Sequence, residues 1–153
     1  MNLKRLFSLL TLIFIGTQGF SQIENPVKWS YTAKKTADKT YELHMTASLD
    51  PKWHIYAQQA GEGPEPTSFR FDKNPLVVLQ GGVKESGKLE KTYDPNFKST
   101  LRYYGNQVDF IQKVKLKSTA TTVVKGFVTY MVCNDNRCLP PKEIPFSIKI
   151  DGK

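Results

Sequence analysis

Cysteine and histidine are the scarcest reactive residues of this chain, which has only two of each. A tetrahedral zinc site needs four ligands, and His44 and His54 are the only histidines that could join the two thiolates. His44 also falls on the polar side of an alternating stretch, which favours a solvated side chain. Neither Cys-x-x-Cys-His nor Cys-x-x-Cys occurs, which excludes c-type haem attachment and a thioredoxin-type motif. We therefore expect no metal and no organic cofactor.

Long apolar runs and clusters of basic residues are also missing beyond the first part of the chain. No segment after residue 21 is apolar enough to span a membrane, since a spanning helix needs about 20 apolar residues. The formal charge is +8, but the lysines are scattered, and Lys113, Lys115 and Lys117 alternate with the apolar residues Val114 and Leu116. This pattern is typical of a solvated strand face, so we expect neither nucleic-acid binding nor stable membrane insertion.

The first residues have the three parts of an export signal. A positive pair at residues 4–5 precedes an apolar run over Leu6–Ile15, and Gly19 and Ser21 occupy the −3 and −1 positions of a cut before Gln22. The apolar run is too short for a membrane anchor. The pattern predicts a cleaved signal peptide over residues 1–21 and a periplasmic or secreted protein.

The remaining residues, 22–153, have the size of one domain and show no internal repeat and no dividing linker. A chain of this length buries enough core to fold without a disulfide. We therefore predict a single domain over this range.

Apolar and polar residues alternate with a period of two over most of this range, which indicates strands with one buried face. Val123–Val132 is apolar on both faces and is expected to be a central strand. Pro145 places the last strand at a sheet edge or a bulge. The predicted strands are Val27–Ala33, Tyr41–Leu49, Trp53–Ala57, Ser68–Phe71, Leu76–Leu79, Val108–Leu116, Val123–Val132 and Ile144–Ile150.

Turn-forming residues fall between these runs, among them Gly61–Pro66, Gly81-Gly82, Asp94-Pro95 and Gly105-Asn106, and are expected to end strands. No stretch has sustained helical periodicity. Roughly seven to nine short strands predict an all-β fold, a two-sheet sandwich of the immunoglobulin-like type. A closed β-barrel is the alternative.

The two cysteines, Cys133 and Cys138, have four residues between them and follow a strand-like run. A disulfide across so short a loop adds only about 2 kcal/mol in the loop-closure account. Structural bridges of immunoglobulin domains instead join distant strands. A structural disulfide, a redox-active pair and a metal site all remain open, and the exposed polar loop favours thiol-disulfide exchange.

The neighbours of the pair suggest how its two sulfurs differ. Cys133 ends an apolar strand and is expected to be the more buried thiol, so attack on a partner would fall to Cys138, with Cys133 resolving. Arg137 would stabilise a Cys138 thiolate, and Asp135 would oppose it.

Three segments follow one another along the chain: Trp53-His-Ile-Tyr56, then Tyr93-Asp-Pro-Asn-Phe97 followed by Tyr103-Tyr104, then the cysteine block that ends at Pro141. In this order they resemble the amino-terminal periplasmic domain of the thiol:disulfide interchange protein DsbD. The resemblance covers most of residues 22–153 and implies an immunoglobulin-like fold with a redox-active cysteine pair. Members of that family commonly have five residues between the cysteines, and this chain has four.

The resemblance also implies roles for individual residues. Asp94 and Phe97 would belong to a cap loop, with Phe97 over the disulfide, and Trp53 and Tyr56 would line the neighbouring surface. Cys138 would bond to partners. Any one of these aromatic residues could instead belong to the core. The family usually has an acidic pair in its cap, where this chain has Asp94-Pro-Asn96.

These observations lead to one functional hypothesis and one alternative. The hypothesis is periplasmic electron relay by a thiol-disulfide oxidoreductase component. As the resemblance implies, a thioredoxin-like protein would donate electrons, and a periplasmic disulfide isomerase or a cytochrome c maturation thioredoxin would accept them. The alternative is a non-catalytic secreted sandwich that binds a partner and uses the disulfide to hold a loop.

Overall fold

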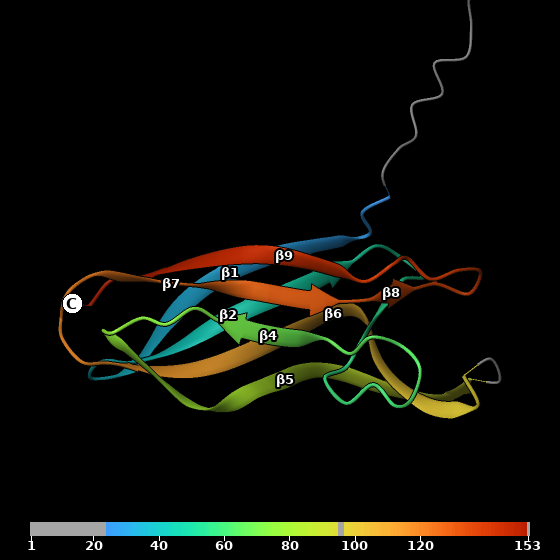
Figure 1. Ribbon diagram of the computed structural model, residues 1–153, viewed down its shortest axis with the longest axis horizontal. Helices are drawn as coiled ribbons and strands as arrows, with labels where there is room; N and C mark the ends of the chain where they lie inside the picture. The colour runs from blue at the N-terminus through green and yellow to red at the C-terminus, as the bar shows by residue number, and fades with distance from the viewer. Residues whose placement is uncertain (1–23, 95–96, 153) are drawn as a thin grey trace, which may run out of the picture.

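The computed structural model describes residues 24–94 and 97–152, so the predicted signal peptide lies outside the described residues (Figure 1). Within these ranges the regular structure consists of strands, and no helix is present. The strands are β1 Val27–Ala37, β2 Thr40–Leu49, β3 His54–Tyr56, β4 Ser68–Phe71, β5 Val77–Asp94, β6 Ser99–Leu116, β7 Thr122–Tyr130, β8 Val132–Cys133 and β9 Lys142–Ile150. It follows that the described part has no helix long and apolar enough to cross a membrane.

The strands form two sheets that face each other (Figure 1). The larger sheet has the order β1-β2-β6-β3-β8, with β5 also paired to β6, and the smaller sheet has the order β4-β7-β9. All the pairings between these strands are antiparallel. This arrangement is a β-sandwich and confirms the predicted all-β, immunoglobulin-like fold.

The core lies between the sheets and is built from the inward side of each alternating strand. Leu43, Met45 and Ala47 of β2 are fully buried, and so are Phe110 and Val114 of β6. A wide apolar core between the layers accounts for most of the stability of such a domain. The main core therefore includes neither cysteine.

Two expectations about strand position are confirmed. Strand β7, which is the first part of the predicted strand Val123–Val132, lies in the middle of the smaller sheet, and β9 lies at its edge. Pro145 sits in β9 opposite Phe127 of β7. A proline has no N–H to give to a second neighbour, so an edge strand accommodates it.

The expected breaks at Gly81-Gly82 and Gly105-Asn106 are wrong. Strands β5 and β6 run on through both sites and form a long hairpin whose register shifts between Gln80 and Lys84 and between Gly87 and Leu89. Gly81 has a φ of 69° and Asn106 a φ of 58°. Residues in this conformation occur in bulges, which bend a strand without ending it. The hairpin consequently reaches the end of the sandwich where β8 lies (Figure 1).

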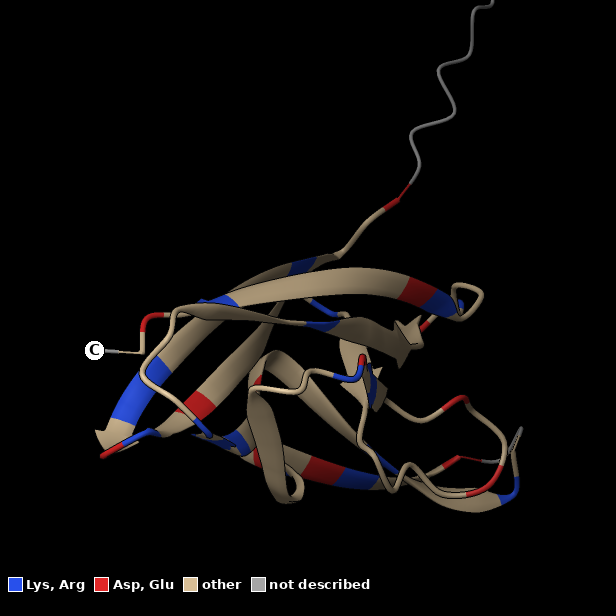
Figure 2. Ribbon diagram, turned by 60° about the vertical axis from the view of Figure 1, so that its left-hand side comes forward, with Lys and Arg blue, Asp and Glu red and all other residues tan. Residues whose placement is uncertain are grey.

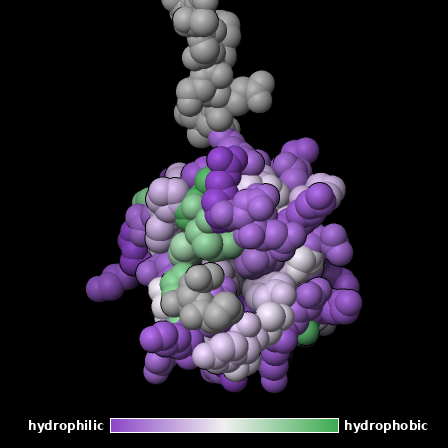
Figure 3. All heavy atoms as spheres, turned by 90° about the vertical axis from the view of Figure 1, so that its right-hand side faces the viewer, coloured by the Kyte–Doolittle hydropathy of each residue, from purple (hydrophilic) through white to green (hydrophobic). Residues whose placement is uncertain are grey.

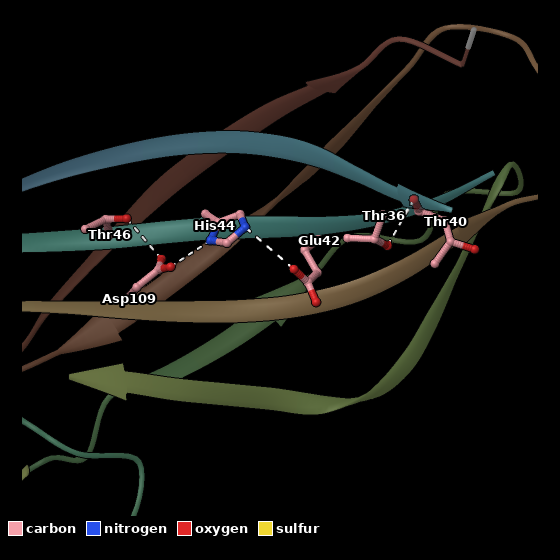
Figure 4. Close-up of polar contacts among 6 residues, drawn as sticks. All are labelled: Thr36, Thr40, Glu42, His44, Thr46 and Asp109. Atoms are coloured by element: carbon pink, nitrogen blue, oxygen red, sulfur yellow. Dashed lines mark hydrogen bonds and ion pairs between the residues drawn. The ribbon is translucent and has the colours of Figure 1, made fainter. Parts of the chain in front are cut away.

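His44 is not the plainly solvated side chain that its position predicted. On the outer face of the larger sheet, its Nδ1 lies 2.6 Å from Asp109 Oδ2, and Thr46 Oγ1 donates a hydrogen bond to Asp109 Oδ1 at 3.0 Å (Figure 4). Thr46 and Asp109 are register partners on β2 and β6, which brings His44 within diagonal reach of Asp109.

Over the rest of the described chain, basic and acidic residues are interspersed over several strands and loops (Figure 2).

Candidate functional site

The two cysteines form a disulfide at the edge of the larger sheet. Cys133 ends the two-residue strand β8, and Cys138 pairs back to it as an isolated bridge. Cys133 is 2% exposed, whereas Cys138 is exposed, so the predicted difference between the two thiols is confirmed. Cys138 is therefore the cysteine nearer to solvent, and Cys133 belongs to the interior.

The loop between the cysteines is held by its own polar groups. The Asn134 N–H donates to the carbonyl of Arg137 at 2.9 Å, and Asn134 Oδ1 accepts from the backbone N–H groups of Asn136 and Arg137, both at 2.9 Å. Side chains that bond to nearby backbone in this way define tight turns. The Arg137 guanidinium forms an ion pair with Glu24, which joins the loop to the start of the described chain.

Phe97 lies near the cysteine pair, at the turn between β5 and β6. It packs on a small apolar cluster made of Tyr56, Ala60, Leu101 and Cys133, which is separate from the main core. Its backbone N–H donates to Asp94 Oδ1 at 3.3 Å. The two residues predicted to form a cap are thus adjacent to the cysteine pair, although Pro95 and Asn96 between them lie outside the described residues.

Gly63 supports the Phe97 ring from the loop after β3. A Cβ at this position would lie 2.7 Å from Phe97 Cγ and 2.9 Å from Cε1, closer than real contacts allow. The glycine also has a φ of 116°, a conformation that side chains rarely adopt. The absence of a side chain at Gly63 therefore lets the Phe97 ring approach the backbone closely.

We expect Gly63→Ala to displace Phe97 and to raise the rate at which a small thiol such as dithiothreitol reduces the disulfide. The matched control is Gly81→Ala, which also places alanine at a positive φ but meets no atom within 4 Å. Both variants should lose about 1–2 kcal/mol of stability from the backbone strain. Equal reduction rates in the two variants would show that Phe97 does not limit access.

Tyr56 touches the buried sulfur directly. Its hydroxyl donates a hydrogen bond to Cys133 Sγ at 3.2 Å. Burial, followed by the charge of Asp94 and the neighbouring Tyr103, raises the pKa of Tyr56 to about 12. The phenol therefore stays protonated at neutral pH and can stabilise negative charge on Cys133.

A pocket of about 300 Å³ opens beside the disulfide and contains most of the predicted site residues. Cys133, Cys138, Tyr56, Asp94, Phe97 and Arg137 all line it. Figure 3 looks onto this end of the sandwich and shows an apolar region set in a polar surface. The pocket thus places both cysteines among aromatic, polar and charged side chains.

Trp53 is a correction to the predicted site. Its side chain is 8% exposed, belongs to the main core cluster and does not line the pocket. Alternation along β3 explains this, because residues on either side of a position point to opposite faces of the sheet. Trp53 and Ile55 face the core, whereas His54 and Tyr56 face the cysteines.

The structure adds His54 and Tyr103 to the site. Both line the pocket, and their ring centroids lie 4.3 Å apart. His54 and Tyr56 are two residues apart in a strand and therefore share a face of the sheet. The sequence could have identified His54 as a site residue on this ground. Tyr103 follows from its register pairing with Tyr56, which the sequence alone does not provide.

Burial lowers the pKa of His54 below its ordinary value, although the carboxylates of Asp135, Glu90 and Asp94 act in the opposite direction. The folded protein therefore favours the neutral form of His54, whereas the same side chain binds a proton more readily in the unfolded chain. Its contribution to stability is therefore complete above the unfolded pKa of about 6.5 and is lost as the pH falls below that value.

We expect the stability of the wild-type protein to decrease more steeply below about pH 6.5 than that of His54→Gln. The measurement is urea unfolding at several pH values above the range in which carboxylates titrate. Parallel stability curves for the two proteins would contradict a lowered pKa.

The fold and this site define a class of protein, a β-sandwich with a disulfide at a sheet edge, beside a pocket that Phe97 lines. The family described as thiol:disulfide interchange protein DsbD, N-terminal, matches residues 23–149, and the chain belongs to it. This finding confirms the resemblance seen in the sequence. A comparison with curated proteins found no match.

Two solved structures show the same fold. The reduced DsbD N-terminal domain of Neisseria meningitidis is 17% identical, with a TM-score of 0.54, over 82% of this chain and 86% of that one. The N-terminal periplasmic domain of ScsB from Proteus mirabilis is 16% identical, with a TM-score of 0.53, over 82% of this chain. The match spans only 45% of that ScsB chain.

Proposed function

We propose that this protein exchanges thiols and disulfides through Cys133 and Cys138 in the periplasm. The observation that carries the proposal is the asymmetry of the disulfide, in which Cys138 is exposed, whereas Cys133 is buried in a cluster against which Phe97 packs and accepts a hydrogen bond from Tyr56. Membership of the thiol:disulfide interchange family supports it. The description of the similar ScsB domain as periplasmic supports the location.

Reduction of the pair begins at Cys138. A donor thiolate attacks Cys138 Sγ and forms a mixed disulfide, while the bond to Cys133 breaks and its electron pair leaves on Cys133 Sγ. The Tyr56 hydroxyl stabilises this leaving thiolate by its hydrogen bond. The second thiol of the donor then attacks the donor sulfur that is bonded to Cys138. This step releases Cys138 as a thiolate, so the cysteine pair has gained two electrons.

Oxidation follows the reverse course with an acceptor. The Cys138 thiolate attacks an acceptor disulfide, one acceptor sulfur leaves, and Cys133 then attacks Cys138 Sγ and frees the second acceptor sulfur. We propose a thioredoxin-like donor and, as acceptor, a periplasmic disulfide isomerase or a cytochrome c maturation thioredoxin. The cysteines carry the electrons themselves, so the cycle uses no metal and no organic cofactor.

The Phe97 cap gives this cycle selectivity. Its ring packs on the cluster that contains Cys133 and lines the same pocket as Cys138. A docking protein would displace the ring and gain contact area in return, whereas a small thiol gains nothing comparable. The site is thereby protected from unselective reduction until a partner binds.

The proposal is tested by trapping the mixed disulfide. The Cys133→Ala variant, mixed with a thioredoxin whose resolving cysteine is replaced and whose remaining cysteine is activated as an aryl disulfide, should form a covalent adduct through Cys138. Cys138→Ala is the matched control and should form almost none, because Cys133 is buried. Absence of an adduct with Cys133→Ala, or equal yields from both variants, would contradict the proposal.

A further inference from the structure

His54 has a position that the exchange steps above leave without a role. It is the cross-strand partner of Cys133, and Cys133 is in turn paired with Cys138. Because cross-strand partners project from the same face of a sheet, the imidazole and both sulfurs lie in one row on the pocket side. All three residues line the pocket.

The partner of His54 on its other side is Gly105 of β6, which has no side chain. The ring of Tyr103 instead holds the imidazole at a centroid distance of 4.3 Å, and Tyr56 packs edge-on at 5.4 Å and 86°. Tyr56 is also the residue that donates to Cys133 Sγ. The imidazole is thus packed between two aromatic rings, on the same side of the sheet as the buried cysteine.

The chemistry requires a proton acceptor at this position. After Cys138 has formed a mixed disulfide with an acceptor, Cys133 must lose its thiol proton before it can attack. Tyr56 can donate a hydrogen bond to the resulting thiolate but stays protonated and cannot take up the proton. Arg137 is permanently charged and paired with Glu24, so it accepts no proton either.

We propose that His54 accepts the proton of the Cys133 thiol when Cys133 resolves the mixed disulfide at Cys138. The inference rests on the proposed function and assigns one step of it. The Cys133 S–H bond breaks, its proton passes to a ring nitrogen of His54, and the sulfur electron pair forms the bond to Cys138 Sγ. The acceptor sulfur leaves with the electron pair of the broken mixed disulfide, and the imidazolium then returns its proton to that sulfur or to solvent.

The groups around the imidazole suit this task. Burial keeps His54 neutral at pH 7 and hence able to accept a proton, while Asp135 of the cysteine loop and Glu90 and Asp94 of β5 stabilise the imidazolium once it forms. The phenol rings of Tyr103 on β6 and Tyr56 on β3 also contact it, and Arg137 lines the same pocket. A base of this kind works best when its neutral form predominates at the working pH.

The test follows one turnover with glutathione disulfide as the acceptor. The reduced protein is mixed with it, quenched with acid at intervals, and the glutathione adduct of Cys138 is counted by mass spectrometry. For the wild-type protein, we expect the rate of adduct resolution to rise with pH and reach a plateau below neutrality. For His54→Gln, we expect resolution at pH 7 to be at least about tenfold slower, since a general base contributes about 10²–10⁴-fold.

Two further variants separate proton transfer from packing. His54→Phe keeps an aromatic ring against Tyr103 and should be as slow as His54→Gln, with a rate that rises continuously with pH. His44→Gln removes the other histidine, which pairs with Asp109 far from the cysteines along β2, and should behave as wild type. Wild-type resolution by His54→Phe, or an unchanged pH profile in His54→Gln, would overturn the proposal.

The small acceptor keeps this test independent of protein partners. If glutathione resolution depends on His54 but no adduct forms with thioredoxin, the relay proposal fails and the proton-transfer assignment stands. If the adduct with thioredoxin forms and the His54 variants resolve normally, the assignment alone fails.

Discussion

Replacement of both cysteines, Cys133→Ser with Cys138→Ser, should abolish thiol-disulfide exchange completely while the protein still folds. The main core lies between the sheets and does not include either cysteine. A disulfide across a loop this short contributes only about 2 kcal/mol through the entropy of the unfolded chain. We therefore expect a lower unfolding temperature, a normal β-type circular dichroism spectrum and no measurable reduction of a partner disulfide.

The control for this variant is the wild-type protein with its cysteines reduced and alkylated by iodoacetamide. The alkylated protein should also lack exchange. If it is less stable than the double serine variant, the difference measures the steric effect of the added alkyl groups. A double serine variant that fails to fold would mark the disulfide as structural. That result would favour the alternative of a binding module whose disulfide holds a loop.

Phe97→Ala should increase the rate at which small thiols reduce the disulfide by about five- to tenfold. Full burial of a phenylalanine side chain is worth about 1.5–3 kcal/mol, and this ring is only partly buried, so the cap loses about 1–1.5 kcal/mol of packing. A difference of 1.4 kcal/mol corresponds to about tenfold in population. The measurement is the loss of disulfide under dithiothreitol, followed by mass counting of alkylated thiols.

Tyr93→Ala provides the matched control, since Tyr93 belongs to the same hairpin but is 62% exposed and contributes to no buried cluster. This variant should be reduced at the wild-type rate. If Phe97→Ala is also unchanged, the ring does not gate the site. Access to Cys138 would then be limited by the cysteine loop itself.

The general fold could be predicted from the sequence because period-two alternation reports which face of a strand is buried. Pro145 and the doubly apolar run at Val123–Val132 even gave the correct edge and central positions. The hairpin of β5 and β6 could not be predicted, since a glycine at a bulge and a glycine at a turn have the same sequence pattern. Only the strand that pairs with the glycine distinguishes a bulge from a turn, and the paired residues lie far away in the sequence.

The site was predictable to the extent that it is local. The unequal burial of Cys133 and Cys138 follows from the end of an apolar strand, and Tyr56 and Phe97 follow from the family resemblance. The resemblance predicts Trp53 beside the cysteines because it covers a whole segment. Alternation from Trp53 to Tyr56 decides which residues of that segment face the sulfurs. The row from His54 to Cys133 depends on the register between β3 and β8, which arises only in the folded sheet.

The reduction potential of the Cys133–Cys138 pair is the most direct test of whether the protein exchanges electrons. The purified protein is equilibrated with glutathione at several ratios of thiol to disulfide, and its free thiols are alkylated and counted by mass spectrometry. We predict a value between roughly −180 and −270 mV, the range of proteins that exchange thiols and disulfides. A value below about −300 mV, typical of structural disulfides, would contradict the proposed function.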